Sequence, residues 1–183
     1  MAESRRREPR KKQEEREELD ERVVDIRRVA KVIKGGRRFA FRTVVVVGDN
    51  KGNRGIGVGK ARAVPDSIRK AAERARRNME NVSLAGSTIP YTVTGRYGGA
   101  RVLLKPAAPG TGGIAGGGCR AVLEAVGVRN ILTKSQGSAN LLNVTMATLD
   151  ALKQLRSPEQ LAQMRGKEVN EVAPVWQRRG KAE

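Results

Sequence analysis

The chain has 183 residues, and its 37 Lys or Arg residues outnumber its 19 Asp or Glu residues, which gives a formal net charge of +18. This length allows one domain or two small ones, and a folded body with such a charge repels itself unless a polyanion is nearby. Nucleic acid is the expected polyanion, because each phosphate contact releases condensed counterions. A membrane partner is not expected, since no apolar run approaches the roughly 20 residues that span a bilayer.

The sequence offers little for catalysis or metal binding. It has no histidine, the commonest general base and metal ligand, and its single cysteine, Cys119, is expected to be a small buried thiol. Glu124 is expected to form an ordinary ion pair with Arg120 on a helix. We therefore expect no enzyme activity, no catalytic residue, no cofactor and no metal. The lone cysteine and the lack of an apolar signal-peptide core favour a cytoplasmic location.

The first part of the chain divides into a charged arm, residues 1–18, and an α+β unit, residues 19–82. The first 22 residues contain eight basic and eight acidic groups, so the positive excess lies in the rest of the chain. β-branched residues and glycine turns predict three strands, and Pro65 suits the first turn of a helix with apolar residues at helical spacing. The expected strands are 23–33, 39–47 and 55–61, and the helix begins after Val64.

A second α+β unit is expected over residues 88–165, with a basic tail at 166–183. A turn-rich boundary with Gly86 and Pro90 separates the units. The second unit is expected to contain two strands around a glycine turn, a helix, a strand and another helix. These elements correspond to 88–107, 120–126, 128–137 and 139–155, and a short helical piece follows at 157–166. The predicted fold class is therefore α+β, with two small domains.

The stretch GNRGIGVGKARAVPDSIRKA, residues 52–71, looks like a phosphate-binding loop but fails the Walker A pattern. Arg54 stands where that pattern needs its first glycine, and Ala61 stands where it needs a serine or threonine. Alternating glycines leave one strand face without side chains, so either the following helix or an RNA backbone could approach closely, and both alternatives have equal weight. These glycines are Gly55, Gly57 and Gly59.

Basic side chains cluster around the turn Gly35-Gly36, which is predicted to form a hairpin finger with charged sides. Phe39 and Phe41 share one face of the second strand and are expected in the core. Aromatic residues make up 3% of the chain, too few for the stacking platforms of single-strand binders. Contacts with the backbone and 2′-hydroxyls of structured RNA are therefore expected.

The predicted helix after Val64 carries its own basic stripe. Lys70, Arg74 and Arg77 recur at helical spacing, opposite the apolar positions. We interpret this stripe as ordinary helix solvation, with local ion pairs. The expected pairs are Asp66–Lys70 and Glu73–Arg77.

Five stretches carry a more specific signal: RVAKVIKGGRRFAF, TVVVVGDNKGNRGIGVGKARAVPDSIRKAAERARRNM, LKPAAPGTGGIAGGGCRAVLEAVGVRNILTKSQGS, NLLNVTMATLDAL and SPEQLAQMRGK. In this order, from about Leu19 to Lys167, they resemble one family, the bacterial small-subunit ribosomal proteins conventionally numbered five. The family often has glutamate where this chain has Ala63. The resemblance implies an N-terminal domain like a double-stranded-RNA-binding fold, and a C-terminal βαβ-type domain of the fold named after the family.

The resemblance also implies a function and partners. It implies a non-enzymatic constituent of the small ribosomal subunit that binds small-subunit rRNA at the head–body junction and supports translational accuracy. Expected neighbours are the ribosomal proteins numbered four and eight and the messenger RNA entry path, with no membrane and no homo-oligomer. The candidate rRNA-binding residues are Arg27, Arg28, Lys31, Lys34, Gly35, Gly36, Arg37, Arg38, Arg42, Lys51, Asn53, Arg54, Lys60, Arg62 and Lys134. The candidate protein-interface residues are Gly110, Thr111, Gly112, Gly113 and Arg120.

Two alternatives remain open at this point. The chain could be a free regulator that binds double-stranded RNA away from ribosomes. It could also be an enzyme like the small-molecule kinases that share the fold of the second domain, with the glycine run at 110–118 as its phosphate loop. That run satisfies the loose dinucleotide pattern G-x-G-x-x-A, but it lacks a clean preceding strand and a following acidic residue.

Overall fold

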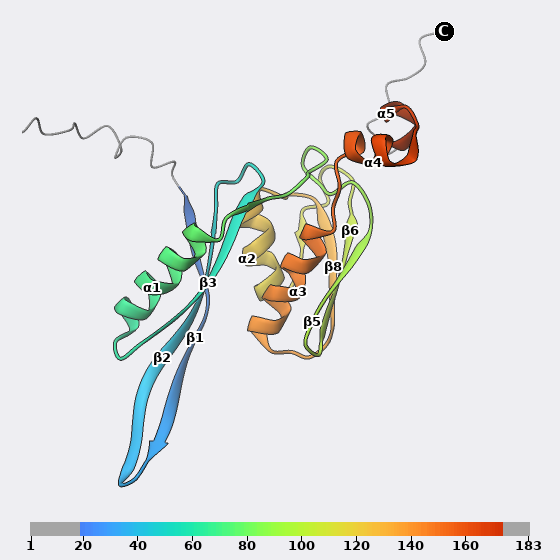
Figure 1. The fold of residues 1–183 in the computed structure, drawn as a ribbon. Coiled ribbons are helices and arrows are strands. Elements are labelled where there is room, and N and C mark those ends of the chain that lie inside the picture. The colour runs from blue at the N-terminus through green and yellow to red at the C-terminus, as the bar shows by residue number, and fades with distance from the viewer. Residues whose placement is uncertain (1–18, 174–183) are drawn as a thin grey trace, which may run out of the picture.

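The computed structural model describes residues 19–173, which form two α+β units and a small helical appendage (Figure 1). In the first unit an antiparallel sheet has the strand order β1-β2-β3-β4, and α1 packs on β2 and β3. These elements are β1 (Asp20–Ile33), β2 (Gly36–Gly48), β3 (Asn53–Ala61), α1 (Val64–Arg77) and β4 (Glu80–Asn81). The three predicted strands and the helix are confirmed, and β4 is an additional short strand.

Both faces of β2 are buried over its last residues, which explains the run of β-branched residues there. Val45 and Val47 pack in a cluster with the alanines of α1, whereas Val44 and Val46 point to the opposite side of the sheet. That opposite side faces the second unit. A central strand covered on both sides has no polar face, so its sequence is continuously apolar.

The second unit has a sheet in the order β5-β6-β8-β7, in which β7 runs parallel to β8 and the other pairs are antiparallel. Its helices α2 and α3 pack together, and α3 lies against β5 and β6. The elements are β5 (Val93–Tyr97), β6 (Ala100–Pro106), β7 (Gly113–Ile114), α2 (Gly117–Val126), β8 (Ile131–Gly137) and α3 (Leu141–Lys153). The predicted strands and helices are present, although the first helix begins three residues earlier than the predicted 120–126.

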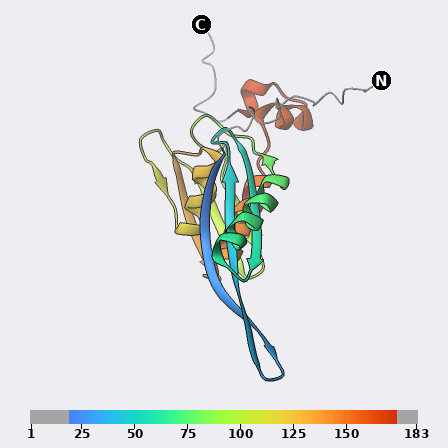
Figure 2. The ribbon, with the colours of Figure 1, turned by 90° about the vertical axis from the view of Figure 1, so that its left-hand side faces the viewer.

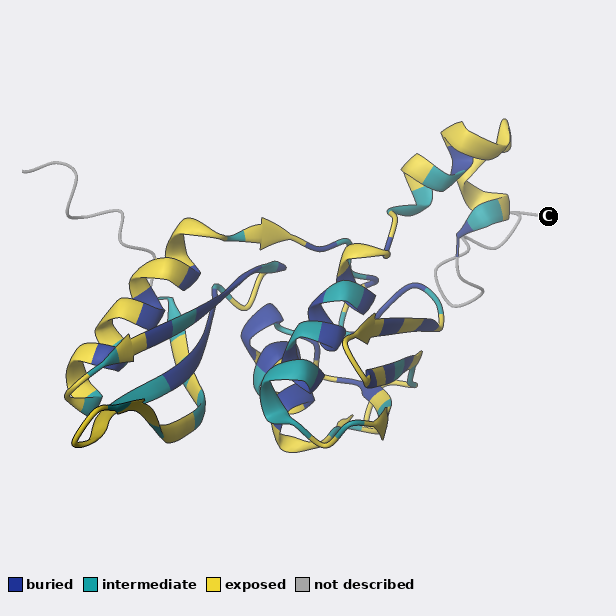
Figure 3. Ribbon diagram, turned by 60° about the horizontal axis from the view of Figure 1, so that its bottom comes forward, coloured by how far each residue is buried: buried dark blue, intermediate teal, exposed yellow. Residues whose placement is uncertain are grey.

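The two units share one hydrophobic core. Val44, Val46 and Ile56 of the first sheet belong to the same buried cluster as the apolar residues of α2 and α3. The α2 helix contacts β1, β2 and β3, so the order of layers is α1, first sheet, α2 with α3, second sheet (Figures 1 and 3). Gly48 permits the close approach, because a Cβ there would lie 2.0 Å from the carbonyl oxygen of Ala125. The two units are therefore packed directly against each other.

The chain after α3 forms two short helices, α4 (Pro158–Arg165) and α5 (Val169–Val172), which pack on each other away from the sheets (Figure 1). A capping box begins α4: the Ser157 hydroxyl accepts from the Gln160 backbone N–H, and the Gln160 side chain accepts from the Ser157 N–H. The predicted short helix at 157–166 is thus confirmed. Within residues 19–173 no helix combines the length and the apolar character that crossing a bilayer requires.

Candidate RNA-binding interface

The β1–β2 hairpin extends far beyond the body of the first unit (Figures 1 and 2). We call its outer part, residues 26–42, the finger. At its tip Gly35 has a φ of 87°, a left-handed conformation that side-chain-bearing residues rarely adopt, so the tight turn requires glycine. Arg42, near the root, is partly buried. The exposed cations of the finger are Arg27, Arg28, Lys31, Lys34, Arg37 and Arg38.

One face of the finger is basic. The hairpin register places Arg27 opposite Arg42 and Lys31 opposite Arg38, and Lys60 of β3 continues the first row because it lies opposite Arg42. Like charges directly opposite each other destabilise a sheet. The carboxylate of Asp25, with Oδ2 2.8 Å from Arg27 Nε, offsets part of this repulsion. A polyanion would relieve the rest.

The other face of the finger carries the aromatic side chains together with two arginines, because Arg28 lies opposite Phe41 and Arg37 lies opposite Val32. Phe39 is 47% exposed, and the guanidinium carbon of Arg28 lies 3.7 Å from its ring centroid. The expectation that Phe39 lies in the core is wrong, because the finger extends past α1 and no other described element covers this face. Phe41, closer to the root, is partly buried. The stacked Arg28 is held over the ring by a cation–π contact, which reduces the freedom of its charged group.

The remaining candidate RNA contacts do not form one patch. Lys60 and Arg62 are exposed at the end of β3 beside the finger root, whereas Lys51 lies in the loop before β3. A strand of this length separates Lys51 from Lys60 by about 30 Å. Lys134 is exposed on β8 in the second unit. The finger therefore dominates the candidate interface, and Lys51 and Lys134 would contact different RNA segments.

The loop that holds Lys51 is organised by a carboxylate. Asp49 accepts hydrogen bonds from the backbone N–H groups of Lys51 and Asn53 at 2.8 and 2.9 Å, and from Asn53 Nδ2 at 2.6 Å. Burial alone would raise the pKa of Asp49, but these hydrogen bonds outweigh burial and hold the pKa below its ordinary value. The Asn53 side-chain oxygen also accepts from Asn81. Asn53 therefore stabilises the loop through its own hydrogen bonds. RNA could bond to the Asn53 side-chain amide only by replacing them.

Arg54 was expected to contact rRNA, but it lies in the interior of the protein. Its side chain is 1% exposed, and it donates to the backbone carbonyl of Leu149 in α3 and to Glu80, each at 3.3 Å. Burial lowers the pKa of Arg54, and the nearby Glu80 opposes this effect. Glu80 also pairs with Lys153 at 2.8 Å, and this bond, together with that from Arg54, lowers the Glu80 pKa despite partial burial. Arg54 is therefore a link between the two units and is inaccessible to phosphate.

The glycines of β3 were expected to make room either for the following helix or for an RNA backbone. The structure shows that they make room for the helix. A Cβ at Gly57 would lie 1.9 Å from the carbonyl oxygen of Ala71 in α1. Cβ atoms at Gly55 and Gly59 would meet other α1 carbonyl oxygens at 2.0 Å. The bare face of β3 is thus fully occupied by the backbone of α1. An RNA backbone cannot approach this face.

The basic stripe of α1 is largely compensated by local contacts. Glu73 pairs with Arg77 as expected, whereas Asp66 pairs with Arg69, at 3.2 Å, in place of Lys70. Arg74 donates to the carbonyl oxygen of Val58 in β3 at 2.6 Å. The expected Glu73–Arg77 pair is therefore confirmed and the expected Asp66–Lys70 pair is wrong.

The loop before α2 differs from a phosphate cradle in its hydrogen bonds. The Asn130 side-chain oxygen accepts from the backbone N–H groups of Gly110 and Gly112, each at 3.1 Å, and Thr111 N donates to Ala108 O. A phosphate loop needs these donors for its anion. Sequence reasoning missed Asn130, which is buried and also donates to Ser87. The only local signal for it is an asparagine before a strand.

The two side chains considered as possible catalytic groups, Cys119 and Glu124, both have structural roles. Cys119 is fully buried, as expected, and burial raises the pKa of its thiol although a hydrogen bond from Thr148 opposes this. A thiol with a raised pKa is a poor nucleophile at neutral pH. The expected Arg120–Glu124 pair is wrong: Glu124 pairs with Arg22 of β1, across the junction of the two units. No cluster of three or more metal-binding side chains occurs in the described part of the chain.

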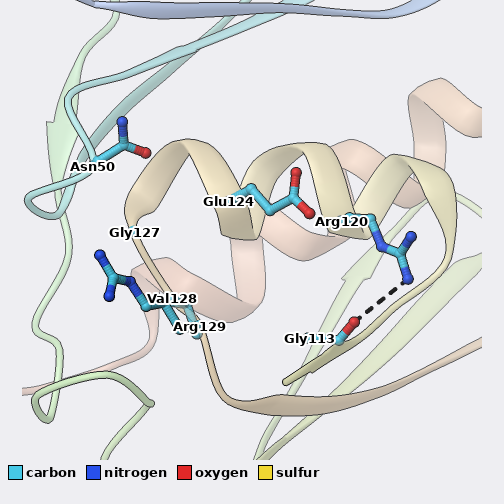
Figure 4. A pocket seen from close by; sticks show the side chains of 7 residues that line it. All are labelled: Asn50, Gly113, Arg120, Glu124, Gly127, Val128 and Arg129. Atoms are coloured by element: carbon cyan, nitrogen blue, oxygen red, sulfur yellow. Dashed lines mark hydrogen bonds between the residues drawn. The ribbon is translucent and has the colours of Figure 1, made fainter. Parts of the chain in front are cut away.

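Arg120 lies at the edge of a cavity of about 460 Å³ on the surface of α2 (Figure 4). Its guanidinium donates to the carbonyl oxygen of Gly113 at 3.5 Å, which ties α2 to the candidate protein-interface loop. Glu124 and Arg129 also line the cavity. Around it, Cβ atoms at Gly110 and Gly112 would meet nothing within 4 Å, so this loop is open to a partner. Two arginines and one carboxylate suit a charged protein surface.

The comparisons agree with this architecture. Residues 19–83 match the family model described as ribosomal protein S5, N-terminal domain, and residues 95–165 match ribosomal protein S5, C-terminal domain. A small ribosomal subunit protein uS5 from Psychromonas ingrahamii is 54% identical over 155 residues, 85% of this chain and 93% of that protein. The uS5 protein of Syntrophobacter fumaroxidans is 55% identical with the same coverage of both chains. The chain belongs to the ribosomal protein S5 family.

Proposed function

We propose that the protein binds small-subunit rRNA chiefly through the finger, as a structural, non-enzymatic constituent of the small ribosomal subunit in the cytoplasm. The observation that carries this proposal is the basic face, with Arg27 opposite Arg42 and Lys31 opposite Arg38. Repulsion between these pairs is tolerated where phosphates neutralise them. The relatives bear the name small ribosomal subunit protein uS5, which agrees with an RNA-rich setting.

The proposal extends to the location of the protein on the small subunit and to its neighbours there. The resemblance to the family supports a position at the head–body junction, near the messenger RNA entry path, with a contribution to translational accuracy. We propose that the open loop at 110–113 and Arg120 contact neighbouring ribosomal proteins, those numbered four and eight being the candidates. The exposed glycines and the charged cavity beside them fit a protein partner, because no side chain blocks close approach of its backbone.

In this proposal the two units bind different partners. The first unit supplies the finger, and the second supplies the loop that meets proteins. Arg54 and the Arg22–Glu124 pair hold these parts together. Contacts made by the finger on RNA would thereby be fixed in relation to contacts made by the loop on protein.

Sedimentation tests the proposed assembly. We expect the protein to co-migrate with the small subunit in sucrose gradients at low salt and at moderately high salt. A protein that stays at the top in both gradients would contradict the ribosomal function and favour a free RNA-binding regulator. Tight binding to generic RNA duplexes in the same preparation would then support that regulator.

Salt-dependent binding tests the finger itself. Replacing Arg37 and Arg38 with alanine should weaken binding to small-subunit rRNA and lower the salt slope by roughly one unit per lost phosphate contact. The matched control is Arg69→Ala with Arg77→Ala, since these side chains already pair with Asp66 and Glu73. An unchanged slope in the finger variant would remove this tip from the interface.

A further inference from the structure

The outer face of the second sheet is a second charged surface, separate from the finger. The α3 helix packs on the inner face, against β5 and β6, and the buried residues Val102, Leu104 and Ile131 point to that side. Side chains that alternate with these project outward, where Figure 1 shows no described helix. Strand register identifies the outward cations, because cross-strand partners share a face. These cations are Arg96, Arg101, Lys105 and Lys134.

The charge on this face has one sign. All four cations are exposed, and none of them forms an ion pair within residues 19–173. Arg96 lies directly opposite Arg101, the same unfavourable arrangement that occurs in the finger. The carboxylate of Asp150, on α3, accepts a hydrogen bond from the Arg96 backbone N–H at 3.0 Å. Residues 81–158 contain no acid apart from Asp150 and Glu124.

An aliphatic strip runs between the cations. Ile114 lies beside Leu132 in the parallel β7–β8 pair, and the two side chains are 56% and 37% exposed. Leu103, opposite Lys134, is partly buried and continues the strip. Cations on both sides of an apolar strip match the arrangement of a nucleic-acid groove, in which phosphates flank the less polar sugars. Arg101 and Lys105 lie about 13 Å apart along β6, so they would contact different phosphates.

We propose that this outer face binds the sugar–phosphate backbone of a second, structured RNA segment. The inference rests on the proposed rRNA-binding function and extends it to a surface of the second unit. The outward positions of the strands carry no aromatic side chain, so base stacking is not available and the contact is with backbone and shape. An acidic protein segment is the competing occupant, and the experiments distinguish the two.

Salt-dependent binding provides the first test, with the full chain and small-subunit rRNA as the probe. The variant Arg101→Gln, Lys105→Gln, Lys134→Gln should lower the salt slope by about three units, one per lost phosphate contact. The control removes the same number of charges from α1, by Arg69→Gln, Lys70→Gln and Arg77→Gln, and should change the slope by less than about one unit. Equal slopes for the two variants would overturn the inference. Since all these positions are exposed, both variants should keep the thermal midpoint of the parent protein.

Directed cleavage provides the second test, on reconstituted small subunits. An iron chelate that generates hydroxyl radicals is attached to Gln136→Cys, next to Lys134 on the outer face, in a Cys119→Ser background. Lys34→Cys in the finger serves as the reference position. Cleavage of rRNA from both positions, at different sites, is expected. Cleavage from Lys34→Cys alone, or crosslinking of Gln136→Cys to a protein, would overturn the outer-face inference while leaving the finger intact. No cleavage from either position would contradict the proposed rRNA-binding function as well.

Discussion

The two glycine-rich segments of this protein do opposite things. In β3, a Cβ at Gly57 would strike the backbone of α1 at 1.9 Å, so these glycines are required by packing. Before α2, a Cβ at Gly117 would meet nothing within 4 Å, so those glycines leave a surface open. Both segments resemble phosphate loops in sequence, but in the loop before α2 the N–H groups of Gly110 and Gly112 already donate to Asn130. The spacing of glycines alone therefore does not distinguish packing from binding.

The largest expected effect separates these two glycine types directly. Gly57→Ala should destabilise the protein by about 3 kcal/mol or more, because α1 must move away from β3. Gly117→Ala, in the first turn of α2, should instead stabilise by about 0.5 kcal/mol, since alanine restricts the unfolded chain. Denaturant midpoints of both variants measure the contrast. A loss below about 1 kcal/mol for Gly57→Ala would contradict the close packing of α1 on β3.

The next effect contrasts buried and exposed arginines. Arg54→Ala should cost about 3 kcal/mol, because it leaves a cavity between the units and removes a hydrogen bond to Leu149. Arg54→Met, which fills the same space without charge, should retain most of the stability. Arg38→Ala, in the finger, should change the free energy of unfolding by less than about 0.5 kcal/mol. If the methionine variant is as unstable as the alanine variant, the charge of Arg54 is itself essential to the junction.

A third effect concerns what holds an open glycine loop in place. Asn130→Ala removes the acceptor for the N–H groups of Gly110 and Gly112 and should cost about 2 kcal/mol. Hydrogen exchange at these two amides should accelerate. The control Ser87→Ala removes only the partner of the Asn130 amide nitrogen and should leave their protection nearly unchanged. Equal protection in the Asn130 variant would contradict its role as the anchor of the loop.

These contrasts explain which parts of the fold were predictable. The β-branched run at 39–47 and the helical spacing after Val64 are local patterns, and the corresponding elements are confirmed. Arg54 could not be placed from sequence, because it is buried by α3, whose Leu149 lies 95 residues later. Phe39 was misplaced for a related reason: strand alternation does not reveal that the hairpin extends beyond its covering helix.

The candidate site shows the same division between local and distant information. The cations around the finger tip are recognisable in sequence, since a glycine turn between strands is a local signal. Their arrangement in opposed pairs depends on the register of the hairpin, with Lys31 opposite Arg38. The outer face of the second sheet brings together Arg101 and Lys134 from strands that are distant in sequence. Only the pairing of β6 with β8 reveals that they share a surface.

The smallest expected effect is a pH dependence of stability. The loop anchored by Asp49 should show it, because Asp49 is ionised, whereas the loop anchored by the neutral side chain of Asn130 should not. Because the folded-state pKa of Asp49 lies below its ordinary value of 3.8, its contribution to stability is complete above the unfolded pKa. That contribution is lost as the pH falls through the folded pKa. The thermal midpoint of the parent protein should therefore decline on acidification more steeply than that of Asp49→Asn. The asparagine side chain keeps one oxygen that accepts from the N–H groups of Lys51 and Asn53. Near neutral pH, the thermal midpoint of the variant should therefore differ from that of the parent protein by an amount that does not change with pH. Parallel curves for the two proteins from about pH 6 to pH 2 would show that the Asp49 charge contributes nothing to this loop.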